Sequence, residues 1–231
     1  LRLPYSIISC PINVQYFECI NSIFEFDDKS IMNPRVALIE ASNFSFDNCN
    51  FIRCGSKIVN EGGCIYYQGI QTTELEKISI QNCYFLECEA TNSAIFKLKL
   101  STLTYPTFYN ITIKGIRSDY SIYISFKVEF RGTVLFDNLK FIENVNCLDG
   151  GGSGIWLNNL RDEFNIYTIH SAFSHCDFIN NYSPNNGGGY GLGYDELVKP
   201  THLTFTDCNF IGNHCDGSDG GGALWIRTST S

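Results

Sequence analysis

The sequence predicts an all-β protein: a single parallel β-helix domain over residues 1–231, with about seven coils and three short strands per coil. A short motif centred on Asn, Asp or His recurs at intervals of about 28 to 39 residues, which is the period of a solenoid. A glycine-rich turn and an alternating strand follow each copy. The composition, with 18 Phe, 20 Gly and one Met, favours strands and turns over helices.

The recurring motif, here called the bend motif, has a hydrophobic strand before a polar residue and Phe or Ile three residues after it. Its copies centre on Asn48, Asn82, Asn110, Asn138, His175 and Asp207. Asn, Asp and His tolerate positive φ better than other non-glycine residues, so we expect a tight bend here, with amides hydrogen-bonded along the stack. His175 is therefore interpreted as a bend residue and not as a catalytic base.

Stacked coils align two further columns. The Phe column points inward and comprises Phe51, Phe85, Ile113, Phe141, Phe178 and Phe210. The second-turn column is expected at a second bend and comprises Cys54, Cys88, Ile116, Asn144, Asn181 and Asn213. A coil of about 30 residues that holds three strands leaves no room for a helix.

The third strand follows the glycines and alternates between two faces. If its aliphatic face is the core, the opposite face carries an aromatic stripe of Tyr66, Phe96, Tyr123, Trp156 and Trp225. One interpretation is a docking face for a glycan or another chain. The other is that a loop, such as residues 20–34 or 158–170, covers it.

The later copies carry F-x-x-N motifs, as in Phe141–Asn144, Phe178–Asn181 and Phe210–Asn213, and Gly221-Gly-Ala-Leu224 matches G-G-A-[ILV]. Paired repeats of this kind resemble the passenger domains of chlamydial-type polymorphic outer membrane proteins and their eukaryotic surface relatives. The resemblance covers nearly the whole chain. It implies a right-handed parallel β-helix that acts as an adhesin or as part of a surface structure.

The 11 cysteines suggest disulfides. Cysteines in neighbouring coils of one column would have Cα atoms about 4.8 Å apart, within the range of about 4.4–6.8 Å that a disulfide accepts. Cys54–Cys88 is the best pair, because turn positions have the freedom to adopt the disulfide dihedral. Cys49–Cys83 and Cys176–Cys208 are also stacked, and are interpreted either as disulfides or as small buried hydrophobic residues. No partner is assigned to Cys10, Cys19, Cys64, Cys147 and Cys215.

An extracellular or cell-surface location is expected from the cysteines together with three N-x-S/T sequons at Asn43, Asn110 and Asn181. The net charge is −8 and the basic residues are scattered, which argues against a nucleic-acid partner. No apolar run reaches the roughly 18 residues that a membrane helix needs.

No catalytic, cofactor or metal site is predicted. The acids Asp149, Asp216 and Asp219 lie beside glycines and are interpreted as solvated turn residues. The chain contains no C-x-x-C pair, and its four histidines do not form a ligand set. It also lacks a phosphate loop, a nucleophile elbow and a dinucleotide fingerprint.

The two ends of the chain are in register with each other. Joining one copy to the next would separate the last small position from the following Cys by 18 residues, against 17 to 19 between internal copies. We therefore expect an extracellular structural or adhesive protein that stacks head-to-tail on itself into a fibre, or a window of a longer surface passenger that contacts glycans or cell-surface proteins. The alternative is a polysaccharide-binding or pectate-lyase-like polysaccharide-degrading β-helix.

Overall fold

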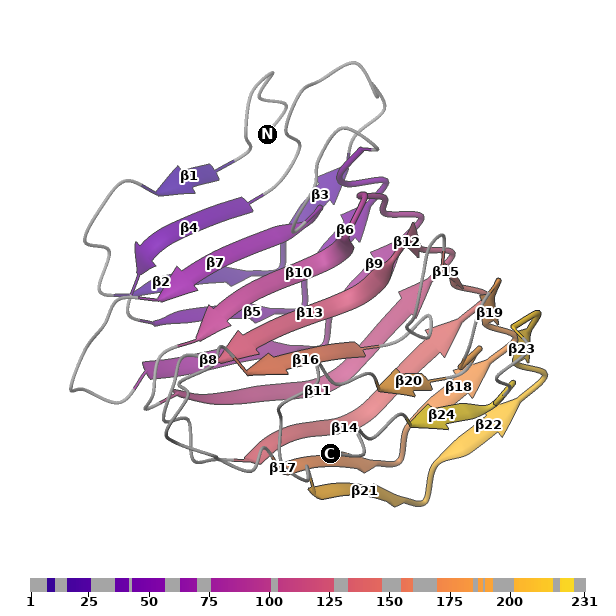
Figure 1. Cartoon of the computed structure of the whole chain (residues 1–231). Coiled ribbons are helices and arrows are strands. Elements are labelled where there is room, and N and C mark those ends of the chain that lie inside the picture. The colour runs from indigo at the N-terminus through magenta and orange to yellow at the C-terminus, as the bar shows by residue number, and fades with distance from the viewer. Residues whose placement is uncertain are drawn as a thin grey trace.

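The chain is all-β in the parts that the computed structural model describes. These are residues 8–10, 16–25, 36–41, 43–56, 63–69, 76–100, 104–126, 133–146, 155–159, 170–184, 187–188, 190–192, 202–217 and 221–226. These ranges form 24 strands and no helix (Figure 1). Every strand pair among them is parallel. In the described residues no helix has the length and apolar character needed to cross a membrane.

One sheet has six strands, each from the part of a repeat that follows the glycines or their equivalent. In spatial order it comprises β1 (Ile8–Cys10), β4 (Val36–Ala41), β7 (Ile65–Gly69), β10 (Ser93–Leu100), β13 (Tyr120–Phe126) and β16 (Ile155–Asn159). Sequence order and spatial order agree, so successive repeats lie side by side in this sheet (Figure 1).

A second sheet has 12 strands and contains the segments on both sides of each bend motif. Its longer row comprises β2 (Phe17–Ile20), β5 (Phe44–Asp47), β8 (Glu76–Gln81), β11 (Thr104–Lys114), β14 (Thr133–Ile142), β17 (His170–Ser174) and β21 (His202–Thr206). The strands after the bend are β3 (Ile23–Glu25), β6 (Asn50–Ile52), β9 (Tyr84–Leu86), β18 (Asp177–Ile179) and β22 (Asn209–Ile211). β11 and β14 run through the bend and pair with strands on both sides of it.

Two small sheets complete the arrangement. One comprises β12 (Arg117–Ser118), β15 (Val145–Asn146), β19 (Tyr182–Ser183) and β23 (His214–Cys215). The other pairs β20 (Tyr190–Leu192) with β24 (Leu224–Ile226). The sequence predicted three strands per repeat and missed the short strand after the second bend, because two residues carry too little pattern to identify a strand.

The bend motif adopts the predicted conformation. Positive φ values of 51 to 56° occur at Asn48, Asn82, Asn110, Asn138, His175 and Asp207, and Asn21 adds an earlier copy at 52°. Side-chain amides bond from one repeat to the next: Asn110 Nδ2 donates to Asn82 Oδ1 at 2.8 Å, and Asn138 Nδ2 donates to Asn110 Oδ1 at 3.0 Å. Each bend is therefore set by its own residue type and tied to its neighbour.

The second bend lies one residue earlier than predicted. Positive φ occurs at Arg53, Glu87, Gly115, Glu143, Asn180 and Gly212. The residues assigned to this turn, the second-turn column, instead point into the protein, where Cys54, Cys88, Ile116, Asn144 and Asn181 are buried. The prediction was wrong by one position because the bend residue varies from repeat to repeat and has no common side chain.

Aromatic stacking fills the core as the Phe column predicted. Ring centroids lie 4.8 Å apart for Phe51 and Phe85, 5.1 Å for Phe141 and Phe178, and 4.7 Å for Phe178 and Phe210, with the rings within 8° of parallel. A second stack on the strand before the bend runs through Phe108, Phe136, Phe173 and Phe205 at 4.6 to 5.0 Å. Such pairs add about 0.5–1.5 kcal/mol each beyond the burial of their area.

Buried thiols and amides in the second-turn column share one role. Cys54 Sγ donates to the Phe24 carbonyl at 3.3 Å, and Cys88 Sγ donates to the Phe51 carbonyl at 3.4 Å. In later repeats Asn181 Nδ2 donates to the Phe141 carbonyl at 3.0 Å. Asn144 and Asn213 donate in the same way, to the carbonyls of Ile113 and Phe178. Each side chain thus donates a hydrogen bond to a main-chain carbonyl of the preceding repeat.

Candidate functional site

Three cysteine thiols meet in the core where β7 approaches the second bend. The Sγ atoms of Cys54, Cys64 and Cys88 all lie within 4.8 Å of one another, and all three residues are 0% exposed. Cys54 and Cys88 are neighbours in the second-turn column, whereas Cys64 directly precedes β7. We call these three residues the thiol cluster.

Two glycines bring Cys64 to the other two thiols. Gly55 follows Cys54 and has φ of +81°, and a Cβ built there would overlap the carbonyl oxygen of Glu89. A Cβ at Gly63, which precedes Cys64, would lie 2.8 Å from the same oxygen. Because only glycine allows this approach, the turn before β7 packs against the backbone that carries Cys88.

The three thiols of the cluster differ in the direction of their pKa shifts. Burial raises the pKa of the Cys54 and Cys64 thiols well above the usual value. At Cys88 burial acts in the same direction, but hydrogen bonds with the thiols of Cys54 and Cys64 outweigh it and lower the pKa. Cys88 is therefore the thiol of the cluster that most readily holds a negative charge.

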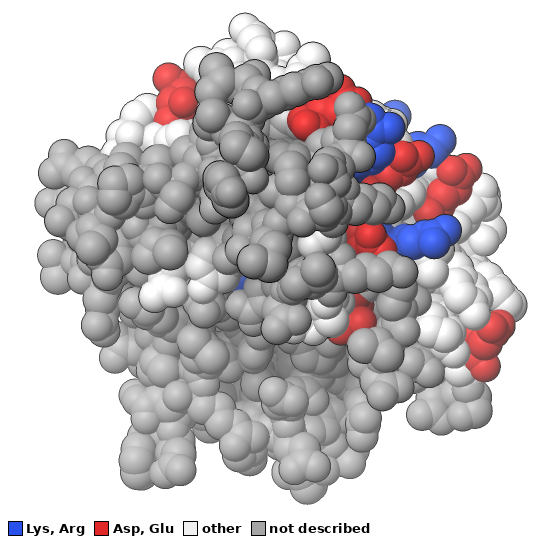
Figure 2. All heavy atoms as spheres, turned by 90° about the horizontal axis from the view of Figure 1, so that it is seen from above, with Lys and Arg blue, Asp and Glu red and all other residues white. Residues whose placement is uncertain are grey.

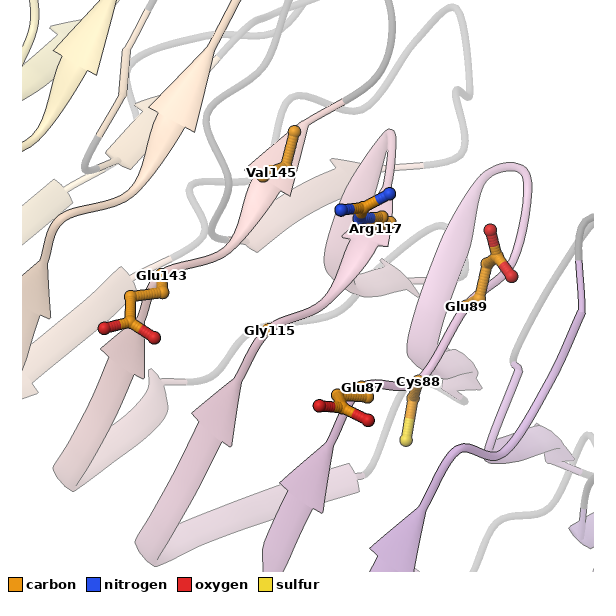
Figure 3. A pocket seen from close by; sticks show the side chains of 7 residues that line it. All are labelled: Glu87, Cys88, Glu89, Gly115, Arg117, Glu143 and Val145. Atoms are coloured by element: carbon orange, nitrogen blue, oxygen red, sulfur yellow. The ribbon is translucent and has the colours of Figure 1, made fainter. Parts of the chain in front are cut away.

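A surface hollow of about 400 Å³ adjoins the thiol cluster. It is lined by Glu87, Cys88, Glu89, Gly115, Arg117, Glu143 and Val145 (Figure 3). In Figure 3 the sulfur of Cys88 points away from the carboxylate of Glu89, so the backbone of this segment separates the hollow from the core. We call this feature the corner hollow.

Charges of both signs surround the corner hollow. Lys114 forms an ion pair with Glu143 at 3.5 Å, and on a neighbouring repeat Arg53 pairs with Glu25. Figure 2 shows acidic and basic side chains interleaved on the side of the molecule where β12, β15 and β19 lie in Figure 1. Surface pairs of this kind contribute about 0–1 kcal/mol each. A hollow with several carboxylates and a guanidinium can bind a polar or cationic ligand.

The predicted cysteine pairs are stacked but are not joined. All nine described cysteines, including Cys49, Cys83, Cys54, Cys88, Cys176 and Cys208, have free thiols. The cysteines that directly follow the first bend, here called the first column, are Cys49, Cys83, Cys176 and Cys208. Their thiols donate to main-chain oxygens, as Cys176 Sγ does to the Phe136 carbonyl at 3.5 Å. Of the two interpretations of Cys49–Cys83 and Cys176–Cys208, the structure agrees with small buried residues, and the Cys54–Cys88 disulfide is not formed. Cys10 is described in its backbone only, and Cys147 lies outside the described residues.

Thiols of the first column also perturb one another. The hydrogen bond from Cys83 lowers the pKa of Cys49 to about 6 and correspondingly raises the pKa of Cys83. Burial raises the pKa of Cys176 to about 12. These residues lie within a column of the core, so their shifts reflect packing and do not mark a separate site.

The three sequons lie in different surroundings. Asn181 is 0% exposed, and its amide nitrogen donates to the Phe141 carbonyl and to Asn213 Oδ1, which argues against the predicted glycosylation there because the acceptor nitrogen is buried and already bonded. Asn110 is exposed and belongs to the stack of amides that are hydrogen-bonded from one bend motif to the next, here called the bend ladder. Asn43 is half-buried, and its side-chain oxygen accepts a hydrogen bond from the backbone of Lys77 at 2.7 Å.

The aromatic stripe needs one correction. Phe96 is 0% exposed and lies opposite Ile65 in β7, so it belongs to the core face. A register shift between Ser93 and Phe96 in β10 adds a residue to this strand, which moves Lys97 into the position assigned to Phe96. Tyr66 is half-buried. The side chains of Tyr123, Trp156 and Trp225 lie outside the description, although the backbones of Tyr123 and Trp156 are paired.

Two exposed histidines have acidic partners at the bends. His175 Nδ1 and the hydroxyl of Ser174 both contact Asp137 Oδ1 at 2.9 Å. The hydroxyl is thus bonded to the carboxylate, whereas a serine nucleophile would need to donate to the imidazole. The hydrogen bond with Asp137 raises the pKa of His175 and lowers that of Asp137.

Asp216, one of the acids interpreted as solvated turn residues, is exposed and takes part in a similar cluster. It accepts hydrogen bonds from Tyr182 at 2.6 Å and has a His214 ring nitrogen at 2.8 Å, and these contacts lower its pKa. Asp149 and Asp219 lie outside the described residues. The exposed position of Asp216 agrees with the interpretation as a turn residue.

Sequence reasoning missed both the thiol cluster and the corner hollow. Cys64 was left without a partner because it belongs to a different strand from Cys54 and Cys88. The available signal was a cysteine directly after the pair Gly62-Gly63, opposite a repeat with cysteine in its second turn. Comparisons of this chain with protein-family models, with curated proteins and with solved structures find no match.

Proposed function

We propose that this chain is a structural or adhesive protein of the cell surface or extracellular space, built as a right-handed parallel β-helix of about seven coils. The continuous ladders support this assignment. Parallel pairing runs in sequence order through the six-stranded sheet and through the longer row of the 12-stranded sheet. Aromatic and amide columns run with them, so each repeat presents the same surface to the next. Such a scaffold suits a load-bearing or display role.

The observation that carries the proposal is the open last described repeat. Inward residues in the preceding repeat are fully covered, with Phe173 at 1% and Phe178 at 0% exposed. Their counterparts one repeat later, Phe205 and Phe210, are only partly buried. The β21 and β22 edges therefore offer half-covered rings, which is the surface that a further coil covers.

A second copy of the chain is the proposed occupant. The Phe column ends at Phe210 on this edge, and at the opposite end of the described stack Phe24 stacks on Phe51, the first member of the column, at 4.6 Å. Phe24 is 7% exposed, so this end of the stack is covered within the chain itself and would have to open for Phe210 of another copy to stack on it. This contact is heterologous and does not close, so it generates a fibre.

Paired variants test the assembly. Phe210→Asp places a charge in the proposed contact, whereas Ile211→Asp places one on a neighbouring side chain that is 55% exposed. We expect electron microscopy of the unmodified protein to show fibres with an axial repeat of about 34 Å for seven coils. Sedimentation should show that Phe210→Asp is monomeric and that Ile211→Asp still assembles.

Two outcomes would contradict assembly between copies. One is that the unmodified protein sediments as a monomer, as Phe210→Asp does, at the same concentrations. The other is a native protein with an intact mass well above 26.0 kDa plus glycans, since the open repeat would then continue within one longer chain. The extracellular location rests on Asn43 and Asn110, and glycopeptide mapping of the native protein tests it.

Polysaccharide binding or cleavage is the second candidate, and the corner hollow favours it. Glu87, Glu89 and Glu143 line this hollow with Arg117, and carboxyl groups beside a basic side chain are groups that acid–base chemistry on a sugar polymer can use. Incubation with pectin- or alginate-like polymers tests it. Product release that Glu143→Gln abolishes and Glu25→Gln retains would favour the enzyme over the scaffold.

A further inference from the structure

Cys64 has a position that the ladders of the fold do not require. Cys54 and Cys88 donate to main-chain carbonyls, as the asparagines of later repeats do, so their burial has a structural explanation. Cys64 lies outside this column, yet its thiol is within 4.8 Å of both, and it is equally buried. The result is a group of soft ligand atoms converging on one point.

The spacing of the sulfurs suits one thiophilic ion. A metal bound to three sulfurs in a plane, with bonds of about 2.3 Å, holds those sulfurs about 4.0 Å apart. The thiols lie within 4.8 Å of one another, so a contraction of less than about 1 Å brings them to bonding distance, within the range of ordinary side-chain adjustment.

The donor set selects the ion. Among the described histidines, cysteines and acids, the group contains only these three sulfurs. Structural zinc sites are almost always four-coordinate, so zinc would lack a ligand. Thiolates also select Cu(I), a soft d¹⁰ ion that is stable with three sulfur ligands. We propose that Cys54, Cys64 and Cys88 bind one Cu(I) ion as a three-coordinate site in the core.

Charge determines the proton release expected on binding. Cysteine binds a metal as its thiolate, so three ligands release three protons, and the site with Cu(I) carries a net charge of −2. The thiol cluster is sealed from water, so this charge weakens binding and makes the affinity rise with pH. The corner hollow, lined in part by Glu87, Cys88 and Glu89, lies on the outer side of the backbone that carries Cys88, and its carboxylates attract cations to the surface beside the cluster. This proposal does not depend on the role of the protein at the cell surface.

The test uses the full chain, reduced and kept free of oxygen. Cu(I) is titrated into the protein in competition with a chromogenic Cu(I) chelator, and X-ray absorption counts the sulfurs around the bound ion. We expect one ion per chain, three sulfurs, and a higher unfolding temperature with the ion than without it. Cys64→Ala should lower the affinity by more than about 100-fold, which exceeds the loss expected from an outer-shell change.

Two further variants separate binding from folding. Cys176→Ala removes an equally buried thiol from outside the cluster and should leave the affinity unchanged. Cys88→Asn removes a ligand but introduces the residue that fills this column in later repeats, so a folded protein without the site is expected. Unchanged copper binding in Cys64→Ala would overturn the proposal. So would a Cys54–Cys88 disulfide in protein isolated without reductant, or binding of Zn²⁺ alone.

Discussion

The buried amide of Asn181 makes the most testable contribution to stability. Its nitrogen donates to the Phe141 carbonyl and to Asn213 Oδ1, both at 3.0 Å. Its oxygen accepts from the backbone and side-chain nitrogens of Asn144, also both at 3.0 Å. Asn181→Ala removes all these bonds at once. The backbone φ of Asn181 is not positive, so alanine fits the local conformation.

The expected loss follows from these bonds. Each buried hydrogen bond has a net value of about 1 kcal/mol, so the four side-chain bonds of Asn181 amount to about 4 kcal/mol. The variant also leaves the backbone and side-chain nitrogens of buried Asn144 without their Asn181 acceptor, which adds to the loss. A change of this size is a large fraction of the roughly 5–15 kcal/mol that stabilises a typical protein.

Equilibrium urea unfolding, followed by circular dichroism and by tyrosine and tryptophan fluorescence, measures the loss. The control is Asn110→Gly, which removes an amide from the exposed bend ladder and retains the positive φ of 51° at no steric cost. We expect this control to lose no more than about 1 kcal/mol. Equal losses of unfolding free energy in the two variants would refute the reasoning, because burial would then not increase the contribution of these hydrogen bonds.

Three further predictions concern packing, a close approach and a surface pair. Phe178→Ala should cost about 3–5 kcal/mol in urea unfolding, since its ring is buried between two stacked rings. Gly55→Ala should destabilise the protein more than Gly115→Ala in the same assay: both have positive φ, but a Cβ at Gly115 meets only a flexible side chain at 3.5 Å, whereas one at Gly55 overlaps a carbonyl oxygen. The His175–Asp137 pair should stabilise the fold between the ordinary pKa values of Asp and His, because the pKa of His175 is raised and that of Asp137 is lowered. This contribution is lost as pH rises through the raised value or falls through the lowered one, and an NMR titration should show a lower His175 pKa in Asp137→Asn.

The sequence predicted those features that repeat with one residue type. Asn48 and its equivalents mark the first bend because few other side chains tolerate positive φ, and the structure confirms them. The Phe column was equally predictable from the sequence, since a Phe or Ile recurs at a fixed distance after each bend. Both features are local and periodic, so the sequence pattern alone specifies them.

Features that depend on the spacing between strands could not be predicted from the sequence. The second bend is occupied by Arg53, Glu87 and Gly115 in successive repeats, and no single preference marks it. The extra residue in β10 reversed the face assigned to Phe96, because a one-residue shift exchanges the two sides of a strand. Cys64 lies beside Cys54 and Cys88 only because Gly55 and Gly63 allow close packing. The spacing of residues along the chain does not predict this contact.

The exchange of cysteine for asparagine in one column changes how the composition is interpreted. Cys54 and Cys88 occupy the same buried positions as Asn144 and Asn181, and both residue types donate to a main-chain carbonyl of the preceding repeat. The early repeats therefore follow the F-x-x-N pattern with a thiol in place of the amide, and their departure from that pattern is chemical and not architectural. A column position explains a buried cysteine without a disulfide, so the number of cysteines carries less weight for an oxidising compartment than the sequence suggested. Cys64, which no column explains, is the cysteine whose function most needs an experiment.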